Sequence, residues 1–234
     1  MKIRPGGLSI CFASLGLHEF QVDDFDRSLA LVEETVKELV DRQVDAIVYT
    51  GTPLTASRGP FFNQELRSRM QTWSGGIPVA TDSGLVLLAL RALGANRVSL
   101  VTPYKDEIVA SVVRVVEAHG FTLAASAGKD LRLAELLTGL DHDSVSKVVE
   151  EVFEMNRQTD AFYISCPQWP IVDNISTIES TYGLPVVTQL GAIMWWVLST
   201  LSIPKHIAGY GYLLENMPPA PSPFDDSSPE VSEK

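Results

Sequence analysis

A cysteine at the end of a predicted strand is the residue of this sequence best suited to acid/base chemistry. The stretch from Asp160 to Ser165 is rich in apolar, strand-forming residues, ends on Cys166 and is followed by a Pro-Gln-Trp-Pro loop. This pattern is typical of a parallel strand that delivers a side chain at its carboxyl end, where α/β sheets bind ligands. An unperturbed thiol has a pKa near ~8.5 that its surroundings can shift, so it can exchange a proton near neutral pH.

A free cysteine is more often a small buried hydrophobe than a functional group, and that alternative stands beside the first. An internal repeat favours the functional interpretation. An offset of 115 residues aligns the segment 25–51 with 140–166 without a gap, and places Gly51 on Cys166. The segments 76–81 and 183–188 share the pattern Gly-x-Pro-Val-x-Thr, and each precedes an apolar helix.

The repeat predicts two copies of one α/β unit. If the copies face each other across a pseudo-two-fold axis, Gly51 and Cys166 lie on opposite walls of one cleft, and one wall alone carries a thiol.

The elements that must position these residues alternate between strands and helices along the chain. Strands are predicted at 8–13, 46–49, 77–80, 98–101 and 121–125, and helices at about 26–42, 60–73, 82–93 and 106–118. Alternation of this kind predicts an α/β fold with parallel sheets and right-handed crossovers. We therefore expect two pseudo-symmetric lobes of parallel sheet flanked by helices, with the active site in the cleft between them.

The expected lobes span residues 1–95, with the C-terminal helix region packed against them, and 96–216. Residues 217–234 are rich in Pro, Ser and acidic residues and are expected to form a disordered tail. The repeat aligns the strand at 121–125 with 8–12, so the segment 97–119 has no counterpart in the first copy. Either the first lobe lacks an edge strand, or the sequence is a truncated or divergent version of a longer parent.

Composition limits the classes of function. The formal net charge of −11 argues against nucleic-acid and anionic-membrane partners, which need a basic surface. The sequence has neither a membrane-spanning apolar run nor a signal peptide, so a cytoplasmic protein is expected. Two cysteines without a CxxC motif and four scattered histidines predict no metal site, and Cys11 is interpreted as a packing residue.

Six motifs together resemble the aspartate/glutamate/hydantoin racemase superfamily, and within it the arylmalonate decarboxylases first and the maleate cis-trans isomerases next. The resemblance covers about residues 8–215. The motifs are Gly51-Thr-Pro-Leu-Thr-Ala-Ser-Arg-Gly59, Arg91-Ala-Leu-Gly-Ala-Asn-Arg-Val98, Thr102-Pro-Tyr104, Ser165-Cys166, Gly183-Leu-Pro-Val-Val187 and Gly209-Tyr-Gly211. The resemblance implies two lobes, each with a four-stranded parallel sheet, and a site between them.

The resemblance also implies roles for individual residues. Racemases and isomerases of this superfamily have a cysteine in each lobe, whereas the decarboxylases keep the second, so Gly51 with Cys166 looks like the one-thiol type. Thr52 and Tyr104 correspond to hydroxyl donors that hold the substrate carboxylate and stabilise an enediolate. The remaining expected substrate contacts are Gly51, Pro53, Leu54, Ser165, Pro167 and Gln168.

Two prolines depart from the family pattern. Pro167 follows the cysteine at a position that the family uses as an N–H donor, and Pro53 stands beside Thr52 in place of a serine. Each lost oxyanion donor could cost on the order of 10²-fold in rate.

The sequence therefore predicts a cofactor-independent decarboxylase of a substituted malonate or similar small carboxylate, in which Cys166 protonates an enediolate. A maleate-type isomerase or amino-acid racemase is the first alternative, and it is disfavoured because Gly51 cannot move a proton. A non-catalytic ligand-binding relative is the second alternative. No metal or organic cofactor is expected, because the sequence has no P-loop or GxGxxG motif.

Overall fold

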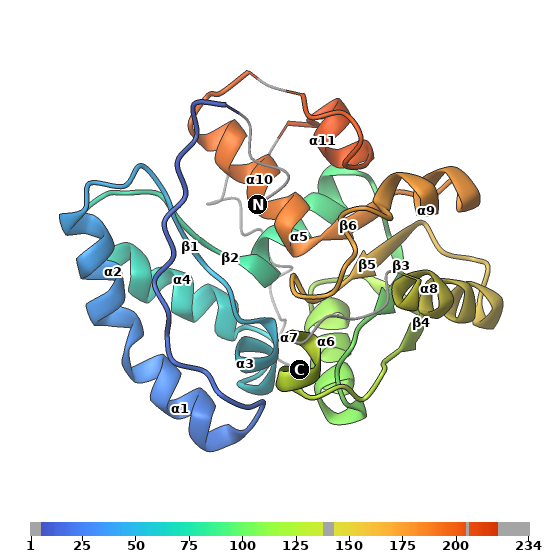
Figure 1. Cartoon of the computed structure of the whole chain (residues 1–234), viewed down its shortest axis with the longest axis horizontal. Helices are drawn as coiled ribbons and strands as arrows, with labels where there is room; N and C mark the ends of the chain where they lie inside the picture. Colours follow the sequence, from blue (N-terminus) through green and yellow to red (C-terminus); the bar gives the residue numbers. More distant parts are fainter. Residues whose placement is uncertain (1–5, 138–142, 205, 220–234) are drawn as a thin grey trace, which may run out of the picture.

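The structure is a computed structural model that describes residues 6–137, 143–204 and 206–219. Its first half contains a small sheet and five helices, arranged on the left of Figure 1 except for α5, which lies at the centre. In order they are α1 (Val22–Ala30), α2 (Val32–Asp41), β1 (Ile47–Tyr49), α3 (Thr52–Ser57), α4 (Phe62–Trp73), β2 (Val79–Thr81) and α5 (Asp82–Ala92).

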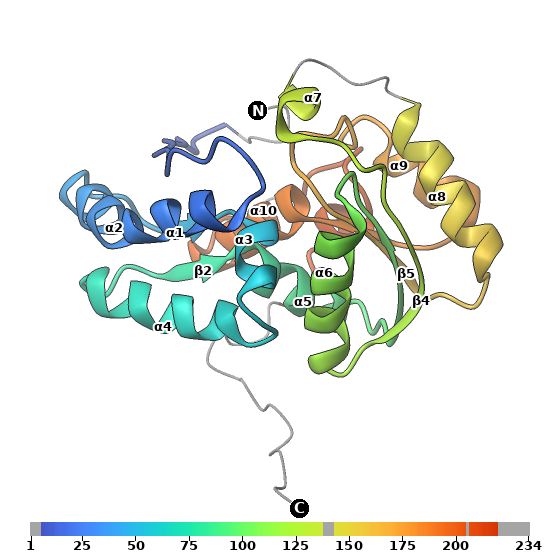
Figure 2. The same ribbon diagram turned by 90° about the horizontal axis from the view of Figure 1, so that it is seen from below.

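The second half forms a larger sheet with helices on both faces (Figures 1 and 2). Its elements are β3 (Arg97–Val101), α6 (Asp106–Ala118), β4 (Thr122–Ala127), α7 (Leu133–Leu137), α8 (Ser144–Met155), β5 (Ala161–Ile164), α9 (Ile175–Tyr182), β6 (Val186–Thr188), α10 (Gln189–Thr200) and α11 (Tyr212–Asn216). The predicted α/β class with parallel sheets is confirmed.

Strand pairing preserves the internal repeat. Strands β1 and β2 form a two-stranded parallel sheet, and the second sheet has the order β4-β3-β5-β6, also parallel throughout. Ile47 lies opposite Val79 in the first sheet, and their repeat counterparts Phe162 and Val186 lie opposite each other in the second. The repeat is therefore a repeat in three dimensions as well as in sequence.

Two helices join the halves at the centre of the molecule. Helices α5 and α10 pack against each other, and each begins directly after the last strand of its copy. Thr81 caps α5 by accepting a hydrogen bond from Gly84 N, and Thr188 caps α10 in the same way from Gly191 N. The two caps hold the N-termini of α5 and α10 in equivalent positions, so each helix begins at the carboxyl end of a strand.

The hydrophobic core has two parts. The larger includes α5, α6, α8, α10 and the second sheet, whereas a smaller cluster fills the first lobe between β1, β2, α2 and α4. Val32 and Val36 of the predicted helix 26–42 lie in the smaller cluster, but Leu31 interrupts that helix and divides it into α1 and α2. The predicted helix 106–118 is α6, with the same limits.

The strand predicted at 8–13 is absent from the described residues, and that prediction is wrong. The segment runs along the first lobe without strand structure, and Phe12 is 82% exposed. The interpretation of Cys11 as a packing residue is also wrong, because its side chain is exposed. In the second lobe β4 pairs with β3, but the first lobe has no strand equivalent to β3 among the described residues. A segment without a neighbouring strand cannot satisfy its backbone groups in a sheet.

Residues at the end of the described chain pack against the core. Trp195 is fully buried, and its indole Nε1 donates to the carbonyl of Pro218 at 2.8 Å. The first residues of the predicted tail therefore contact α10, and the rest of that tail, 220–234, lies outside the described residues. The limits of the two lobes remain predictions. Within the described ranges, no helix has the length and apolar character needed to cross a membrane.

Candidate active site

Cys166 is the second residue after the end of β5 and is 1% exposed. Its φ of +94° falls in the region that side-chain-bearing residues rarely adopt. A glycine would relieve this backbone strain, so the presence of cysteine needs another reason. Strain of this kind concentrates at functional sites, which supports a functional role for the thiol.

The surroundings of Cys166 favour the protonated thiol. Burial raises its pKa above the ordinary value, because the thiolate loses hydration. The backbone N–H groups of Gln168 and Trp169 and the hydroxyl of Tyr104 oppose this rise, and the charge of Asp82 adds to it. The sulfur itself donates to Gln168 Oε1 at 3.2 Å. Although Pro167 has no N–H, the next two residues present theirs to the sulfur.

Gln189, the first residue of α10, connects Cys166 to the opposite lobe. Its Oε1 accepts from Cys166 N at 3.0 Å, so its amide nitrogen points the other way. That nitrogen donates to Ser165 Oγ at 2.7 Å and to Thr52 Oγ1 at 3.2 Å. One buried side chain thus fixes the thiol loop and contacts the predicted donor of the first lobe.

Asp82 makes the equivalent contact on the first wall. It is the first residue of α5, as Gln189 is of α10, and its Oδ2 accepts from Gly51 N at 3.0 Å. The repeat partners Gly51 and Cys166 therefore both donate their backbone N–H to the first residue of the helix that follows. Burial raises the pKa of Asp82 to about 6, against the lowering effect of its hydrogen bonds to Gly51, Ser83 and Thr52.

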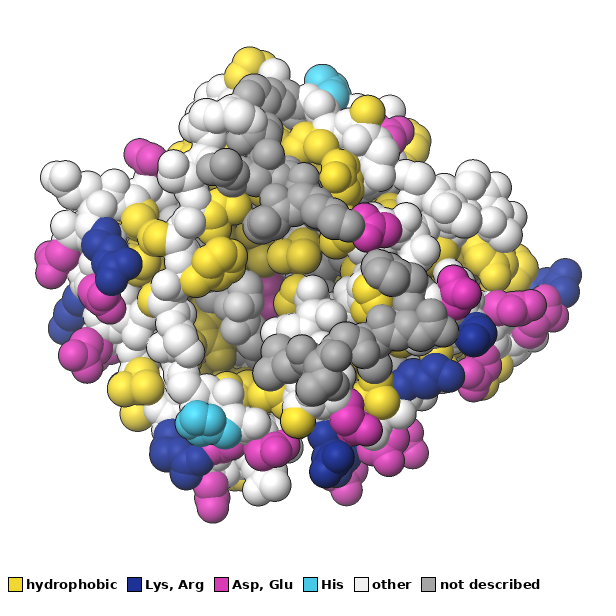
Figure 3. Space-filling view, viewed as in Figure 1, with side chains coloured by type: hydrophobic (Ala, Val, Ile, Leu, Met, Phe, Trp, Pro, Cys, Tyr) yellow, Lys and Arg dark blue, Asp and Glu magenta, His cyan; other side chains and the backbone are white. Residues whose placement is uncertain are grey.

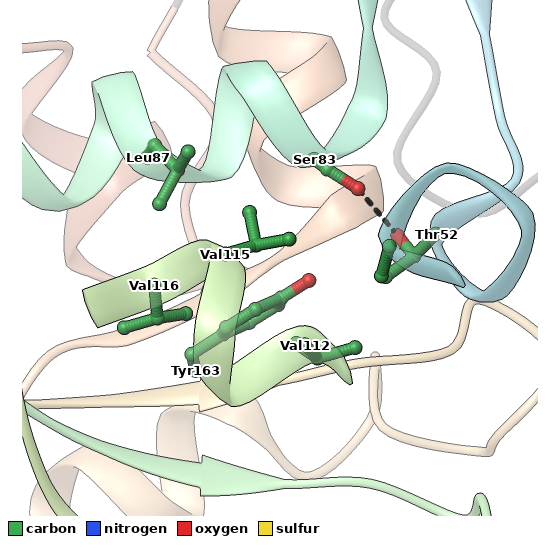
Figure 4. Close-up of a pocket in the computed structure, with 8 residues that line it drawn as sticks. Thr52, Ser83, Leu87, Val112, Val115, Val116 and Tyr163 are labelled. Carbon is green, nitrogen blue, oxygen red and sulfur yellow. Dashed lines mark hydrogen bonds between the residues drawn. The ribbon is translucent and has the colours of Figure 1, made fainter. Parts of the chain in front are cut away.

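Thr52 lies between the side chains of Asp82 and Gln189. It also borders a small cavity (Figure 4). Its hydroxyl donates to Asp82 Oδ2 at 3.2 Å and lies 3.0 Å from Ser83 Oγ. The cavity has a volume of about 10 Å³, enough for about one water molecule. Polar groups at one end are Thr52, Ser83 and Tyr163, and the remainder is lined by Ala56, Leu87, Val112, Val115 and Val116.

Two tyrosines complete the polar groups around the thiol. Tyr104 follows β3 and is 2% exposed, and burial raises its pKa well above the ordinary value. Its ring meets Phe20 edge to face, with 5.5 Å between the ring centroids. The hydroxyl of Tyr163 points toward Thr52 in Figure 4. Burial raises the pKa of Tyr163 as well.

The structure brings together most of the residues that the sequence predicts. Direct contacts connect Gly51, Thr52, Ser165, Cys166, Gln168 and Tyr104 through the network above. Pro53 and Leu54 are buried in the first turn of α3, and Pro167 is half-buried in the loop after β5. The chain is helical from Thr52 onward, and Pro53 fits there because proline suits the first turn of a helix.

Sequence reasoning missed Asp82, Ser83, Gln189 and Tyr163. A signal for two of them was present: the aligned motifs end at Thr81 and Thr188, and the next residue in each copy is Asp82 or Gln189.

Hydrophobic side chains line part of the hollow at the centre of the face in Figure 3. No group of three or more His, Cys, Asp or Glu residues that could hold a metal ion occurs within the described ranges. The polar groups of the site are thus hydroxyls, amides, one thiol and one buried carboxyl group.

Two pseudo-symmetric α/β units with a thiol at one strand end define a class of two-lobed α/β proteins, to which known structures correspond. The liganded form of an arylmalonate decarboxylase double mutant matches with a TM-score of 0.80 at 25% identity, covering 86% of this chain and 85% of that one. A Nocardia farcinica maleate cis-trans isomerase mutant with a covalently bound succinylcysteine intermediate also matches with a TM-score of 0.80, at 25% identity, covering 86% of this chain and 83% of that one.

Sequence comparison places the chain more narrowly. Residues 3–214 match the family model for arylmalonate decarboxylase, and the chain belongs to that family. The maleate isomerase of Nocardia farcinica is 31% identical over 90% of this chain and 86% of its own length. The arylmalonate decarboxylase of Bordetella bronchiseptica is 26% identical over 78% of this chain and 76% of its own length. The predicted resemblance is confirmed, and these relatives are enzymes.

Proposed function

We propose that this protein is a cofactor-independent decarboxylase of a substituted malonate or similar small carboxylate, with Cys166 as the proton donor. The observation that carries the proposal is the asymmetry of the two strand ends. A buried thiol stands at one of them, and at the equivalent position Gly51 has no group that can exchange a proton.

The protonation state of the thiol supports this choice of reaction. Burial raises the pKa of Cys166, so at neutral pH the residue is a thiol and can act as an acid. An isomerase that forms a covalent cysteine adduct needs a thiolate to attack the double bond, and a raised pKa disfavours that state.

The reaction divides into two steps. The bond between the α-carbon and one carboxylate breaks, CO2 leaves, and the electron pair of that bond forms an enediolate. Cys166 then gives its proton to the α-carbon, and the resulting thiolate recovers a proton from solvent. Developing charge on the enediolate requires preorganised donors, for which Thr52 and Tyr104 are the candidates. The N–H groups of Gln168 and Trp169, which face the sulfur, stabilise the transient thiolate.

The test is turnover of a prochiral α-methyl-α-arylmalonate in D2O. A single donor on one wall should give a product deuterated at the α-carbon with one predominant configuration, because the enediolate receives its proton from one side. The isolated product should not exchange its α-proton with solvent at a comparable rate. Racemic product or rapid exchange would contradict the one-thiol mechanism. No reaction with any malonate or cis-dicarboxylate would favour a non-catalytic protein.

Maleate isomerisation is the second candidate, because the 31% identical relative is a maleate isomerase. Incubation with maleate, followed by NMR detection of fumarate, distinguishes the two reactions. Fumarate formation that depends on Cys166 would replace the decarboxylase proposal.

A further inference from the structure

Asp82 is a buried acidic residue that the proposed reaction does not use. It is 1% exposed, and each of its carboxyl oxygens is occupied by hydrogen bonds. Oδ2 accepts from Gly51 N and from Thr52 Oγ1, whereas Oδ1 accepts from Ser83 N at 2.6 Å and from Ser83 Oγ at 3.2 Å. No Lys or Arg pairs with it in the part of the chain that the structure describes. A buried carboxylate without a cation is costly unless it becomes protonated.

The hydrogen of the Thr52 hydroxyl is fixed by its two neighbours. Gln189 uses its oxygen for Cys166 N, so the end that faces Thr52 is an NH2 group, which can only donate. Thr52 Oγ1 is therefore an acceptor toward Gln189. Its single hydrogen goes to ionised Asp82, or to Ser83 Oγ, which itself donates to Asp82. In both arrangements the hydrogen stays within the network around the carboxylate.

A proton on Asp82 reverses this arrangement. The neutral carboxyl group donates to Thr52, whose two lone pairs then accept from Asp82 and from Gln189. The hydrogen of Thr52 no longer has a carboxylate to donate to, and a substrate oxygen can take it in place of Ser83 Oγ, while Asp82 Oδ2 can still accept from Gly51 N. Each carboxyl oxygen accepts from a backbone N–H group, Oδ2 from Gly51 and Oδ1 from Ser83. A carboxyl group is suited to this position because an amide side chain has only one acceptor atom.

We propose that Asp82 is a positioning residue that takes up one proton when an anionic substrate binds and thereby turns the Thr52 hydroxyl into a donor for that substrate. This inference rests on the proposed function, which supplies the carboxylate substrate. Burial independently raises the pKa of Asp82 to about 6, so the proton is within reach near neutral pH.

The other titratable groups that face Asp82 are neutral at that pH. They are Tyr49 on β1, Tyr163 on β5 and Cys166 after β5, and the pKa of each is raised by burial and by the negative charge of Asp82. A bound dicarboxylate adds further negative charge to this region, which favours the protonated state of Asp82.

Calorimetry on an inactive background tests the proton uptake directly. An α-methyl-α-arylmalonate is titrated into Cys166→Ala at pH 7.5 in buffers of different ionisation enthalpy, and the dependence on buffer gives the protons taken up. Uptake of about one proton per bound dianion is expected, and none in the double variant Cys166→Ala, Asp82→Asn. Binding without uptake, or equal uptake in both proteins, would overturn the role of Asp82 and leave the proposed function intact. Failure of malonates and maleate to bind would overturn both.

Kinetics provide a second measurement that does not depend on folding of the Asp82 variant. In the otherwise unmodified protein, kcat/KM should fall as pH rises through the ionisation of Asp82. Thr52→Val should lose roughly 10²-fold in rate and should also lose this limb of the pH profile, whereas Thr52→Ser should keep the limb. The same substrate is used for all three proteins, so its own ionisation affects them equally. An unchanged limb in Thr52→Val would overturn the proposal.

Discussion

The two lobes share a strand register, a helix cap and a backbone contact to the first residue of a helix, yet they differ at the residue that could do chemistry. Within the described residues, the second lobe has four paired strands and supports a cysteine in a strained conformation. In the same part of the chain the first lobe has two paired strands, and it presents Gly51 beside a buried carboxyl group. The comparison indicates that both copies share one backbone scaffold. The side chain at the strand end then decides, in each lobe separately, whether that wall can exchange a proton.

Removing the thiol should have the largest effect on activity. Cys166→Gly makes the second wall resemble the first, and we expect turnover to fall by roughly 10²-fold to 10⁴-fold, the contribution of a positioned acid. Stability should be kept or increased, because glycine accepts the φ of +94° without strain. Steady-state rates and urea unfolding measure the two effects, with Cys11→Ala as the exposed-cysteine control. Full activity in Cys166→Gly would contradict the assignment.

Two phenylalanines, one in each of the aligned segments 8–12 and 121–125, test the difference in sheet completeness. Phe121 precedes β4 and is 6% exposed, whereas Phe12 lies in the corresponding segment of the first copy and is 82% exposed. Phe121→Ala should reduce the free energy of unfolding by about 3–5 kcal/mol, the usual cost of such a truncation in a core. Phe12→Ala should change it by less than about 0.5 kcal/mol. Similar losses in both variants would mean that the first segment is packed.

Asp82 should make stability depend on pH. Its folded pKa of about 6 lies above the ordinary 3.8, so its folded state holds the proton more tightly than the unfolded chain does. Asp82 therefore contributes about 3 kcal/mol to the free energy of unfolding below about pH 4. This contribution is lost as pH rises through about 6. Urea unfolding between pH 4 and 7 of the unmodified protein, compared with Asp82→Asn, isolates this group. Parallel stability curves for the two proteins would contradict the raised pKa.

Adding a thiol to the first wall tests whether one residue separates the lobes. A Cβ at Gly51 would lie 2.6 Å from the hydroxyl oxygen of Tyr49, so Gly51→Cys should cost about 1–3 kcal/mol through overpacking. In a Tyr49→Val background the thiol has room, and slow exchange of the product α-proton in D2O should appear, measured by NMR. Tyr49→Val alone is the control. Exchange in that control would assign the second acid/base group elsewhere.

The smallest effect concerns the end of the described chain. Truncation before Pro218 removes the acceptor of the Trp195 indole and should reduce stability by about 1 kcal/mol, the net value of one hydrogen bond. Truncation after Pro219 retains that acceptor and serves as the control. Equal melting temperatures for both truncations would show that the contact is dispensable.

The sequence predicts the parts of this fold that repeat. Gly51 and Cys166, and the strands before them, could be aligned because the junctions that lead into the two strands, 42–46 and 157–161, share the pattern Arg-Gln-x-Asp-Ala. The partners that hold them could not be found in this way, because Asp82 and Gln189 occupy one structural position with different chemical types. The segment at 8–13 has the composition of a strand, but a strand also requires a neighbour, and composition does not reveal whether one exists. The positive φ of Cys166 likewise depends on the loop that follows it.

The paired starts of α5 and α10 have an electrostatic consequence. The N-terminal end of a helix carries a partial positive charge from its aligned peptide dipoles, and here two such ends meet at the junction of the lobes. This local field favours an anion in a protein whose net charge is −11. Ionised Asp82 neutralises the field of α5, whereas the uncharged Gln189 leaves that of α10 available. An anionic group is therefore held more favourably at the start of α10, next to the thiol.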